Sequence, residues 1–167
     1  MASPATRSHA LLASAALMAA IVVAATAVAC DLDDITVPMA PTFVATLNGA
    51  SEVPAKAVPG TGTAVVVKNG QTYTYAVNFT GMTGPLIGAH IHGPGSTTVA
   101  VGIIVPFITA GATGTSGTFT GTFTSTNTPT ISNDSLDVLM RNGNAYVNLH
   151  TSLNPGGEIR GQLSQQQ

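Results

Sequence analysis

The chain has 167 residues, enough for one domain of ordinary size besides a leader segment. Only 7% of the residues are charged, and Gly, Thr, Val and Ala are abundant, which favours short pleated strands over long surface helices. The formal net charge is −2 and no basic residues cluster, so the composition argues against a nucleic-acid-binding protein.

The first 29 residues have the composition of an export signal. Residues 1–9 are polar with one charge, Arg7, and residues 10–29 carry no charge. The uncharged stretch is also long enough to span a bilayer, so hydropathy alone leaves a retained membrane helix open. We expect a signal peptide at residues 1–29, whose removal leaves four Lys/Arg against seven Asp/Glu, about −3.

Cys30 is the only cysteine and directly follows Ala27-Val28-Ala29. This arrangement resembles the lipobox of bacterial lipoproteins, in which small residues precede a cysteine that receives a lipid and becomes the mature N-terminus. An ordinary signal peptide followed by a chance cysteine is the alternative, although a free thiol is a liability in an exported protein. We expect Cys30 to anchor the protein to a membrane, facing the periplasm or the cell exterior, with residues 30–41 as an acidic tether.

From Thr42 onward, short alternating runs are separated by Gly, Pro, Asn and Ser. The runs at 61–67 and 72–79 flank Asn69-Gly70, a strong hairpin signal. The pattern predicts an all-β domain at residues 42–164, an antiparallel β-sandwich or Greek-key barrel, followed by a polar tail at 165–167. Further strands are expected at Leu86–His92, Val99–Phe107, Thr115–Thr124, Ala145–His150 and Glu158–Leu163.

One short helix is predicted near residues 132–141. Its apolar stripe and its start and stop signals have helical spacing. The stripe is Leu136, Leu139 and Met140, the candidate caps are Ser132, Asn133 and Asp134, and the stop signal is Asn142-Gly143.

Histidine is the obvious reactive residue type of the mature chain. His90 and His92 are two residues apart on an expected strand, so both rings point to the same face. His150 ends another expected strand. If the two strands are neighbours, three imidazoles meet and could bind copper or zinc with one coordination position open. The alternative is that these rings donate to backbone carbonyls and hold loops in place.

No residue pattern predicts a catalytic site. The sequence lacks a nucleophile elbow, a phosphate-binding loop and a dinucleotide fingerprint, and nothing pairs Glu52 with Glu158. Glu158 and Arg160 share a strand face. The two are candidate supporting residues of the histidine site, and the favoured alternative is a structural role as a same-face ion pair or a partly buried anchor.

Four motifs together resemble the CHRD domain, a module named after repeats in chordin. They are the opening strand and turn at Phe43–Pro54, the A-H-I-H-G-P motif within Gly88–Pro94, and the closing motifs at Tyr146–Thr151 and Pro155–Gln162. The resemblance covers about residues 42–164. It implies a fold and a binding or structural role, since these domains are generally regarded as uncharacterised or as interaction modules.

The order of the histidine strands is also similar, more weakly, to Cu/Zn superoxide dismutases. On that comparison His90, His92 and His150 stand where copper ligands stand, and Arg160 stands near an anion-guiding arginine. The bridging histidine, the zinc ligands and the disulfide of those enzymes have no counterpart here. The similarity therefore implies a shared sandwich architecture, and architecture alone does not imply dismutase activity.

Two functions from different classes fit these observations. The first is a lipid-anchored, non-catalytic binding or structural module of the cell envelope, without a cofactor, whose partner is an envelope protein or a glycan. A long polar edge such as Gly114–Thr124 could pair with a strand of such a partner. The second is a copper- or zinc-binding envelope protein that uses His90, His92 and His150. Convergence of the three imidazole nitrogens within about 3–4 Å, with an exposed opening, would favour the second function. If His150 faced away from the pair, or if each ring were capped by a backbone carbonyl, the second function would fail.

Overall fold

The computed structural model describes residues 39–124 and 131–166. The expected signal peptide, Cys30 and most of the expected tether lie outside the described residues. Among the residues that are described, no helix is long and apolar enough to cross a membrane.

The described residues form an antiparallel sheet with one short α-helix and one 3-10 turn. The sheet order is β5-β4-β7-β8-β1-β2-β3-β6, with β9 paired to β1. This is the all-β architecture with one short helix that the sequence pattern predicts. In chain order the elements are β1 (Thr42–Asn48), η1 (Gly49–Ser51), β2 (Thr61–Asn69), β3 (Thr72–Thr80), β4 (Leu86–His92), β5 (Ile103–Pro106), β6 (Gly117–Thr124), α1 (Asn133–Arg141), β7 (Tyr146–Thr151), β8 (Ile159–Gln162) and β9 (Ser164–Gln165).

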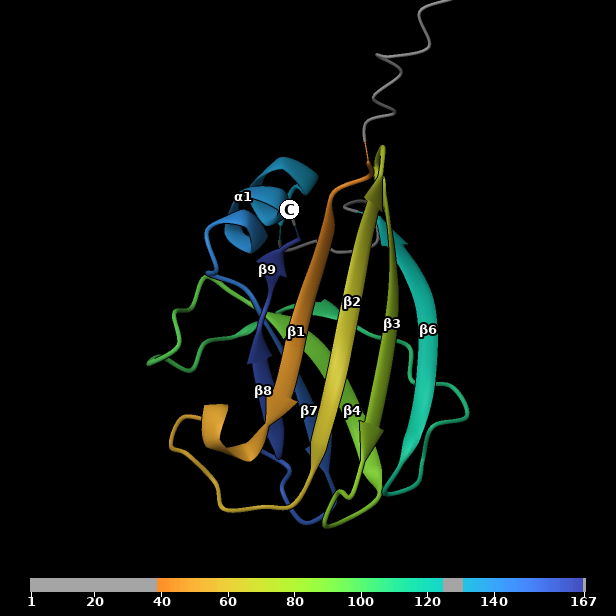
Figure 1. The fold of residues 1–167 in the computed structure, drawn as a ribbon, viewed down its shortest axis with the longest axis vertical. Helices are drawn as coiled ribbons and strands as arrows, with labels where there is room; N and C mark the ends of the chain where they lie inside the picture. The colour runs from red at the N-terminus through yellow and green to blue at the C-terminus, as the bar shows by residue number, and fades with distance from the viewer. Residues whose placement is uncertain (1–38, 125–130, 167) are drawn as a thin grey trace, which may run out of the picture. The chain divides into compact units, whose positions relative to one another are not determined.

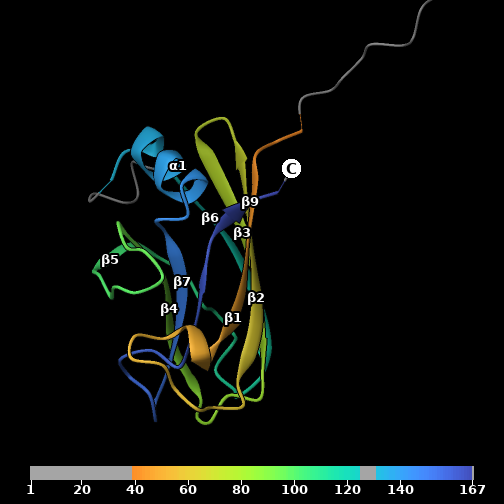
Figure 2. The ribbon, with the colours of Figure 1, turned by 60° about the vertical axis from the view of Figure 1, so that its left-hand side comes forward.

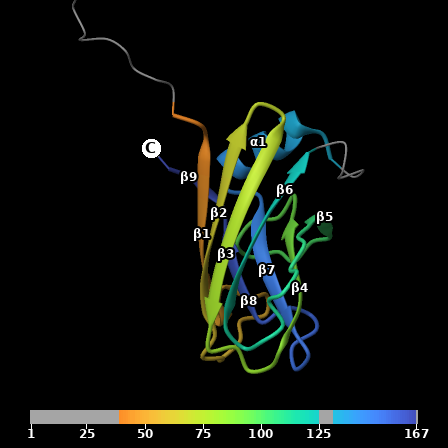
Figure 3. The same ribbon diagram turned by 90° about the vertical axis from the view of Figure 1, so that its right-hand side faces the viewer.

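The sheet curls so that its two halves face each other across the core. Figure 1 shows β1, β2, β3 and β6 side by side, and Figures 2 and 3 show β4 and β7 on the opposite side of the core. Side chains from the two halves meet between them. The ring of Tyr75 on β3 stacks on Phe107, just after β5, with 4.1 Å between the ring centroids.

Alternation along each strand decides which side chains enter this core. In β3, Tyr73, Tyr75, Val77 and Phe79 are buried, whereas the residues between them are exposed. Successive side chains of a strand point to opposite faces, so one face becomes apolar throughout. Burial of each large apolar side chain stabilises the fold by about 1.5–3 kcal/mol.

The β2–β3 hairpin lies where the Asn-Gly signal predicts it, with the turn one position later. Asn69 still pairs with Thr72 in the strand ladder, so the loop consists of Gly70 and Gln71. Gly70 has a φ of +60°, a left-handed conformation that glycine adopts without steric cost.

The helix α1 packs its apolar stripe against the core. Leu136 and Met140 are buried, and Leu139 is partly buried against the same cluster. Of the candidate caps, Ser132 takes the position, because its hydroxyl accepts a hydrogen bond from the backbone N–H of Ser135. Gly143 ends the helix with a φ of +65°.

The strand β5 is shorter than the pattern of Val99–Phe107 suggests, since only Ile103–Pro106 joins the ladder. The preceding segment, residues 93–102, is a loop whose backbone carbonyls accept hydrogen bonds from side chains. The carbonyl of Val99 accepts from Arg160, and the carbonyl of Val101 accepts from His92. Side chains of the sheet thus donate hydrogen bonds to backbone carbonyls that would pair with a neighbouring strand if β5 were longer.

Candidate metal centre

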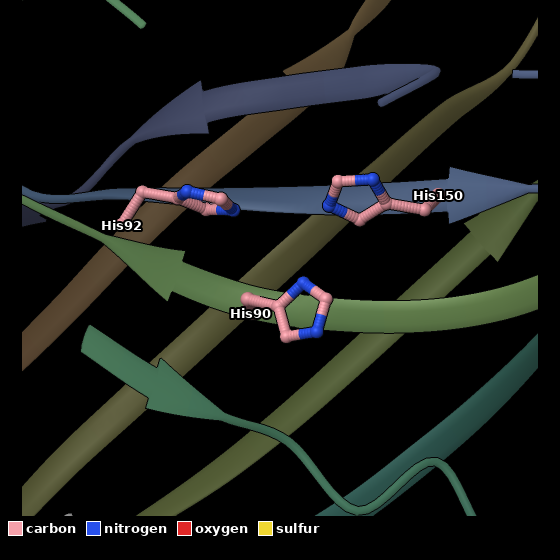
Figure 4. A group of neighbouring side chains, drawn as sticks. All are labelled: His90, His92 and His150. Carbon is pink, nitrogen blue, oxygen red and sulfur yellow. The ribbon is translucent and has the colours of Figure 1, made fainter. Parts of the chain in front are cut away.

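The three histidines lie on two neighbouring strands, on the face turned away from the core. His90 and His92 are on β4, and His150 is on β7, which pairs with β4. Figure 4 shows the three rings turned toward a shared space along these strands. The ring centroids are 4.9 Å apart for His90 and His150, 5.7 Å for His90 and His92, and 5.9 Å for His92 and His150. The strands are therefore neighbours, and the three imidazoles meet.

Loop carbonyls orient two of the three rings. His92 Nδ1 is 2.9 Å from the carbonyl oxygen of Val101, and His150 Nδ1 is 2.9 Å from that of Pro155. Because a carbonyl oxygen can only accept, each Nδ1 carries the proton, and each Nε2 of the neutral ring keeps a free lone pair. The rings thus hold two loops in place and still offer a second nitrogen.

One nitrogen of each histidine is buried without a hydrogen-bond partner. These atoms are His90 Nδ1, His92 Nε2 and His150 Nε2. One ligand nitrogen from each ring lies within 4.8 Å of the other two. An unsatisfied buried polar atom costs about 1–3 kcal/mol, and such atoms are rare in folded proteins. Three of these atoms in one cluster offer their lone pairs to a ligand that accepts them.

All three rings have a pKa below the usual value for histidine. Burial, with smaller contributions from His150 and His92, lowers the pKa of His90 to about 4. Burial also lowers the pKa of His92 and of His150, against the opposing effect of their carbonyl hydrogen bonds. The cluster is therefore neutral at pH 7, the state in which imidazole can coordinate a metal.

Three neutral nitrogen donors can hold a first-row transition metal and leave further positions for water or another ligand. Metal–nitrogen bonds of about 2.0–2.1 Å place such donors roughly 3–4 Å apart. The three nitrogens lie within 4.8 Å of one another, so the rings would have to draw slightly closer around an ion. His90 and His150 are only half-buried, so the edge of the cluster contacts solvent although its free nitrogens are covered.

Arg160 contacts the cluster indirectly, through Tyr146. Its guanidinium donates to the carbonyl of Ser96 at 2.6 Å and to that of Val99 at 3.1 Å. Its Cζ atom lies 3.4 Å from the ring centroid of Tyr146. Tyr146 in turn stacks on His92, with the ring centroids 4.9 Å apart and the ring planes 2° from parallel.

Tyr146 is a residue of this site that the sequence reasoning missed. It faces the same side as His150, four positions along β7, and it pairs directly with His92 on β4. The even spacing between Tyr146 and His150 was visible in the sequence, but the partner strand was not.

Glu158 is a buried carboxylate with its own set of donors. It is 0% exposed, and it accepts hydrogen bonds from the backbone N–H and the hydroxyl of Thr83, at 2.6 and 2.7 Å, from the Thr151 hydroxyl, and from Asn154. Burial opposes ionisation, but these hydrogen bonds outweigh it and lower the pKa of Glu158. Within the described residues no ion pair joins Glu158 to Arg160.

Comparison with known proteins adds a family to this geometry. A search of curated proteins found no match. The family model of the CHRD domain matches residues 43–163, a range that begins in β1, ends directly after β8 and contains all three histidines. Since this match covers most of the chain, the protein belongs to the CHRD domain family.

Proposed function

We propose that this protein is an exported, lipid-anchored CHRD-domain module whose ligand is a transition-metal ion, copper or zinc. The observation that carries the proposal is the cluster of three buried histidine nitrogens without hydrogen-bond partners. A bound metal would satisfy all three lone pairs at once and remove the cost of leaving them unpaired.

Copper is the stronger candidate of the two ions. Imidazole ligands suit both copper and zinc, but a given set of nitrogen donors binds Cu(II) more tightly than Zn(II). The cluster of described residues contains no cysteine or carboxylate, so imidazole alone would set the affinity.

The sequence supports the location and the non-catalytic character of this module. Cys30 follows small residues after an uncharged stretch, the pattern of a lipid-modified N-terminus. An anchor there would hold the histidine cluster outside the cytoplasm, where an envelope protein or a glycan is a further candidate partner. The missing bridging histidine and zinc ligands argue against superoxide dismutase activity.

Metal analysis tests the ligand. The domain spanning residues 35–167 is dialysed against copper or zinc and analysed by mass spectrometry of its metal content. We expect about one equivalent of copper in the unmodified domain. His90→Ala, His92→Ala and His150→Ala should each lose most of it, whereas Thr120→Ala, on the exposed face of β6, should not. Absence of stoichiometric metal from the unmodified domain would contradict the proposal.

Lipid labelling tests the anchor separately. Cells that produce the full chain are grown with a radioactive fatty acid, and the protein is followed through membrane fractionation. We expect label and membrane retention for the unmodified chain and loss of both for Cys30→Ser. An unlabelled mature protein that stays in the aqueous fraction would show that Cys30 is not an anchor.

A further inference from the structure

Arg160 is a buried cation without a carboxylate partner at ion-pair distance in the described part of the chain. It is 1% exposed, and the ion pairs among these residues join Asp137 to Lys68 and Arg141. A buried charge of this kind is costly unless other groups compensate for it. Here backbone carbonyls and the face of Tyr146 do so, and the Glu52 carboxylate attracts the guanidinium from beyond ion-pair distance.

The Tyr146 ring connects this cation to a candidate metal ligand. Arg160 packs on Tyr146, and Tyr146 stacks on His92 with nearly parallel planes. The Tyr146 hydroxyl accepts from the N–H of Val101 at 3.0 Å, and the carbonyl of Val101 accepts from both Tyr146 and His92. Arg160, Tyr146 and His92 therefore form one rigid stack, which we call the cation–aromatic stack.

The unpartnered Nε2 of His92 lies at the edge of the stacked ring, on the side of His90 and His150 (Figure 4). The stack fixes the ring plane, and the Val101 carbonyl fixes the tautomer. The structure gives Arg160 no role as an exposed anion-binding residue, because its guanidinium is covered and its donors are engaged by the carbonyls of Ser96 and Val99.

We propose that Tyr146 and Arg160 are positioning residues of the metal site, and that the Arg160 charge stabilises bound Cu(I) relative to Cu(II). The inference rests on the proposed function of the same histidines. A fixed positive charge repels Cu(II), which carries two charges, more than Cu(I), which carries one. Reduction adds one electron from an external redox buffer to the bound ion and breaks no bond in the protein.

The test measures Cu(I) and Cu(II) affinities of the full chain and its variants, with competing chelators specific for each ion. Replacement of the charge in Arg160→Met should lower the ratio of Cu(I) to Cu(II) affinity about tenfold, the effect of one charge acting over a distance on the order of 10 Å at an effective dielectric of about 20. The spacings along the stack, 3.4 Å from Arg160 Cζ to the Tyr146 centroid and 4.9 Å from there to the His92 centroid, set this scale. For a one-electron couple this ratio corresponds to about 59 mV. Arg141→Met, the same substitution at a partly exposed arginine on α1, is the matched control and should leave the ratio unchanged.

Three further variants separate charge from stacking and keep the test valid if Arg160→Met does not fold. Arg160→Lys keeps the charge and should keep most of the affinity ratio. Tyr146→Leu removes the stack and should weaken binding of both ions by about 10–100-fold, the usual range for groups that orient a metal ligand. Tyr146→Phe keeps the stacked ring and should restore most of the affinity. Thermal unfolding of each variant shows which of them are folded.

The outcomes distinguish this inference from the proposed function. If the unmodified chain binds no copper, both fail. If it binds copper but Arg160→Met and Tyr146→Leu leave both affinities unchanged, the inference is overturned and the metal site stands. A changed spectrum of bound Cu(II) in a folded Tyr146→Leu variant, with recovery in Tyr146→Phe, would support the positioning role, because a loss of stability alone does not alter the spectrum of the metal that remains bound.

Discussion

Glu158 shows at the scale of one residue how this fold treats a buried charge. Its carboxylate receives hydrogen bonds from Thr83, Thr151 and Asn154, which join the start of β8 to the end of β7 and to the segment before β4. Hydrogen bonds to a charged group contribute about 1.5–3 kcal/mol each, more than neutral ones. Glu158 therefore supports the strands that carry the histidines without contacting a ring itself.

Replacement of this carboxylate should be strongly destabilising. Glu158→Gln turns an amide toward groups that donate, and we expect the free energy of unfolding to fall by about 2–4 kcal/mol in urea titrations at pH 7. Asp134→Asn, a comparable change at an exposed position of α1, should cost about 0.5 kcal/mol or less. Because the pKa of Glu158 is lowered from 4.5, its contribution is present above pH 4.5 and is lost as the pH falls through the lowered value. Equal stability of the two variants would contradict this assignment.

The histidine cluster should make the metal-free protein sensitive to mild acid. Burial lowers the pKa of His90 from 6.5 to about 4, so the unfolded chain binds more protons than the folded one between these values. The effect of His90 on the free energy of unfolding is therefore most favourable above pH 6.5, and the free energy of unfolding falls as the pH drops toward 4. Urea titrations at pH 7.5, 6.5, 5.5 and 4.5 should show this decline, and His90→Gln should reduce its slope, with His92 and His150 accounting for part of the remainder. A pH-independent stability across that range would mean that the ring is not desolvated.

At the scale of the element, the end of α1 depends on a left-handed residue. Gly143 has a φ of +65°, and open space surrounds the position where a Cβ would lie. Backbone strain is then the main effect of Gly143→Ala, and we expect a loss of about 1 kcal/mol in the free energy of unfolding. Gly102→Ala is the matched control, because its surroundings are equally open and its φ is outside the left-handed region. Equal losses in the two variants would exclude strain at the helix end as the cause.

The sequence predicted elements well where one signal decided the local structure. Alternation located β3, and the caps and apolar stripe located α1, because these features depend on residues close in the chain. The prediction was wrong at the start of β5. The strand-like sequence pattern begins at Val99, but the chain pairs with β4 only from Ile103. Arg160, distant in sequence, engages the Val99 carbonyl, and local patterns carry no information about that contact.

The candidate site shows the same limit. The sequence predicted that His90 and His92 share a face, since their spacing fixes it. It predicted that His150 joins them only if the two strands are neighbours, because the pairing of β4 with β7 depends on the whole sheet. The stacking of Tyr146 on His92 depends on that same pairing and was therefore not visible beforehand.

At the scale of the whole molecule, the histidines connect the sheet to two loops. His92 holds the loop at 93–102 through Val101, and His150 holds the turn after β7 through Pro155. A ligand that binds the folded state stabilises it in proportion to its concentration and affinity. We expect copper to raise the melting temperature and to slow hydrogen exchange at residues 93–102 and 152–157, the two segments that the histidine rings hold. No slowing of exchange at these two segments in the copper-bound protein would contradict this coupling.

The pairing of β4 with β7 has one more consequence. The two strands are adjacent in the sheet but are separated in the chain by β5, β6 and α1. A metal held by His92 and His150 would therefore act as a clamp, a cross-link that closes a long loop of the chain. A cross-link over a loop of this length disfavours the unfolded ensemble by about 4 kcal/mol. The complete ligand set exists only after this long-range pairing has formed. In a chain exported before it folds, the clamp would close outside the cytoplasm, and the metal supply there would decide which ion it holds.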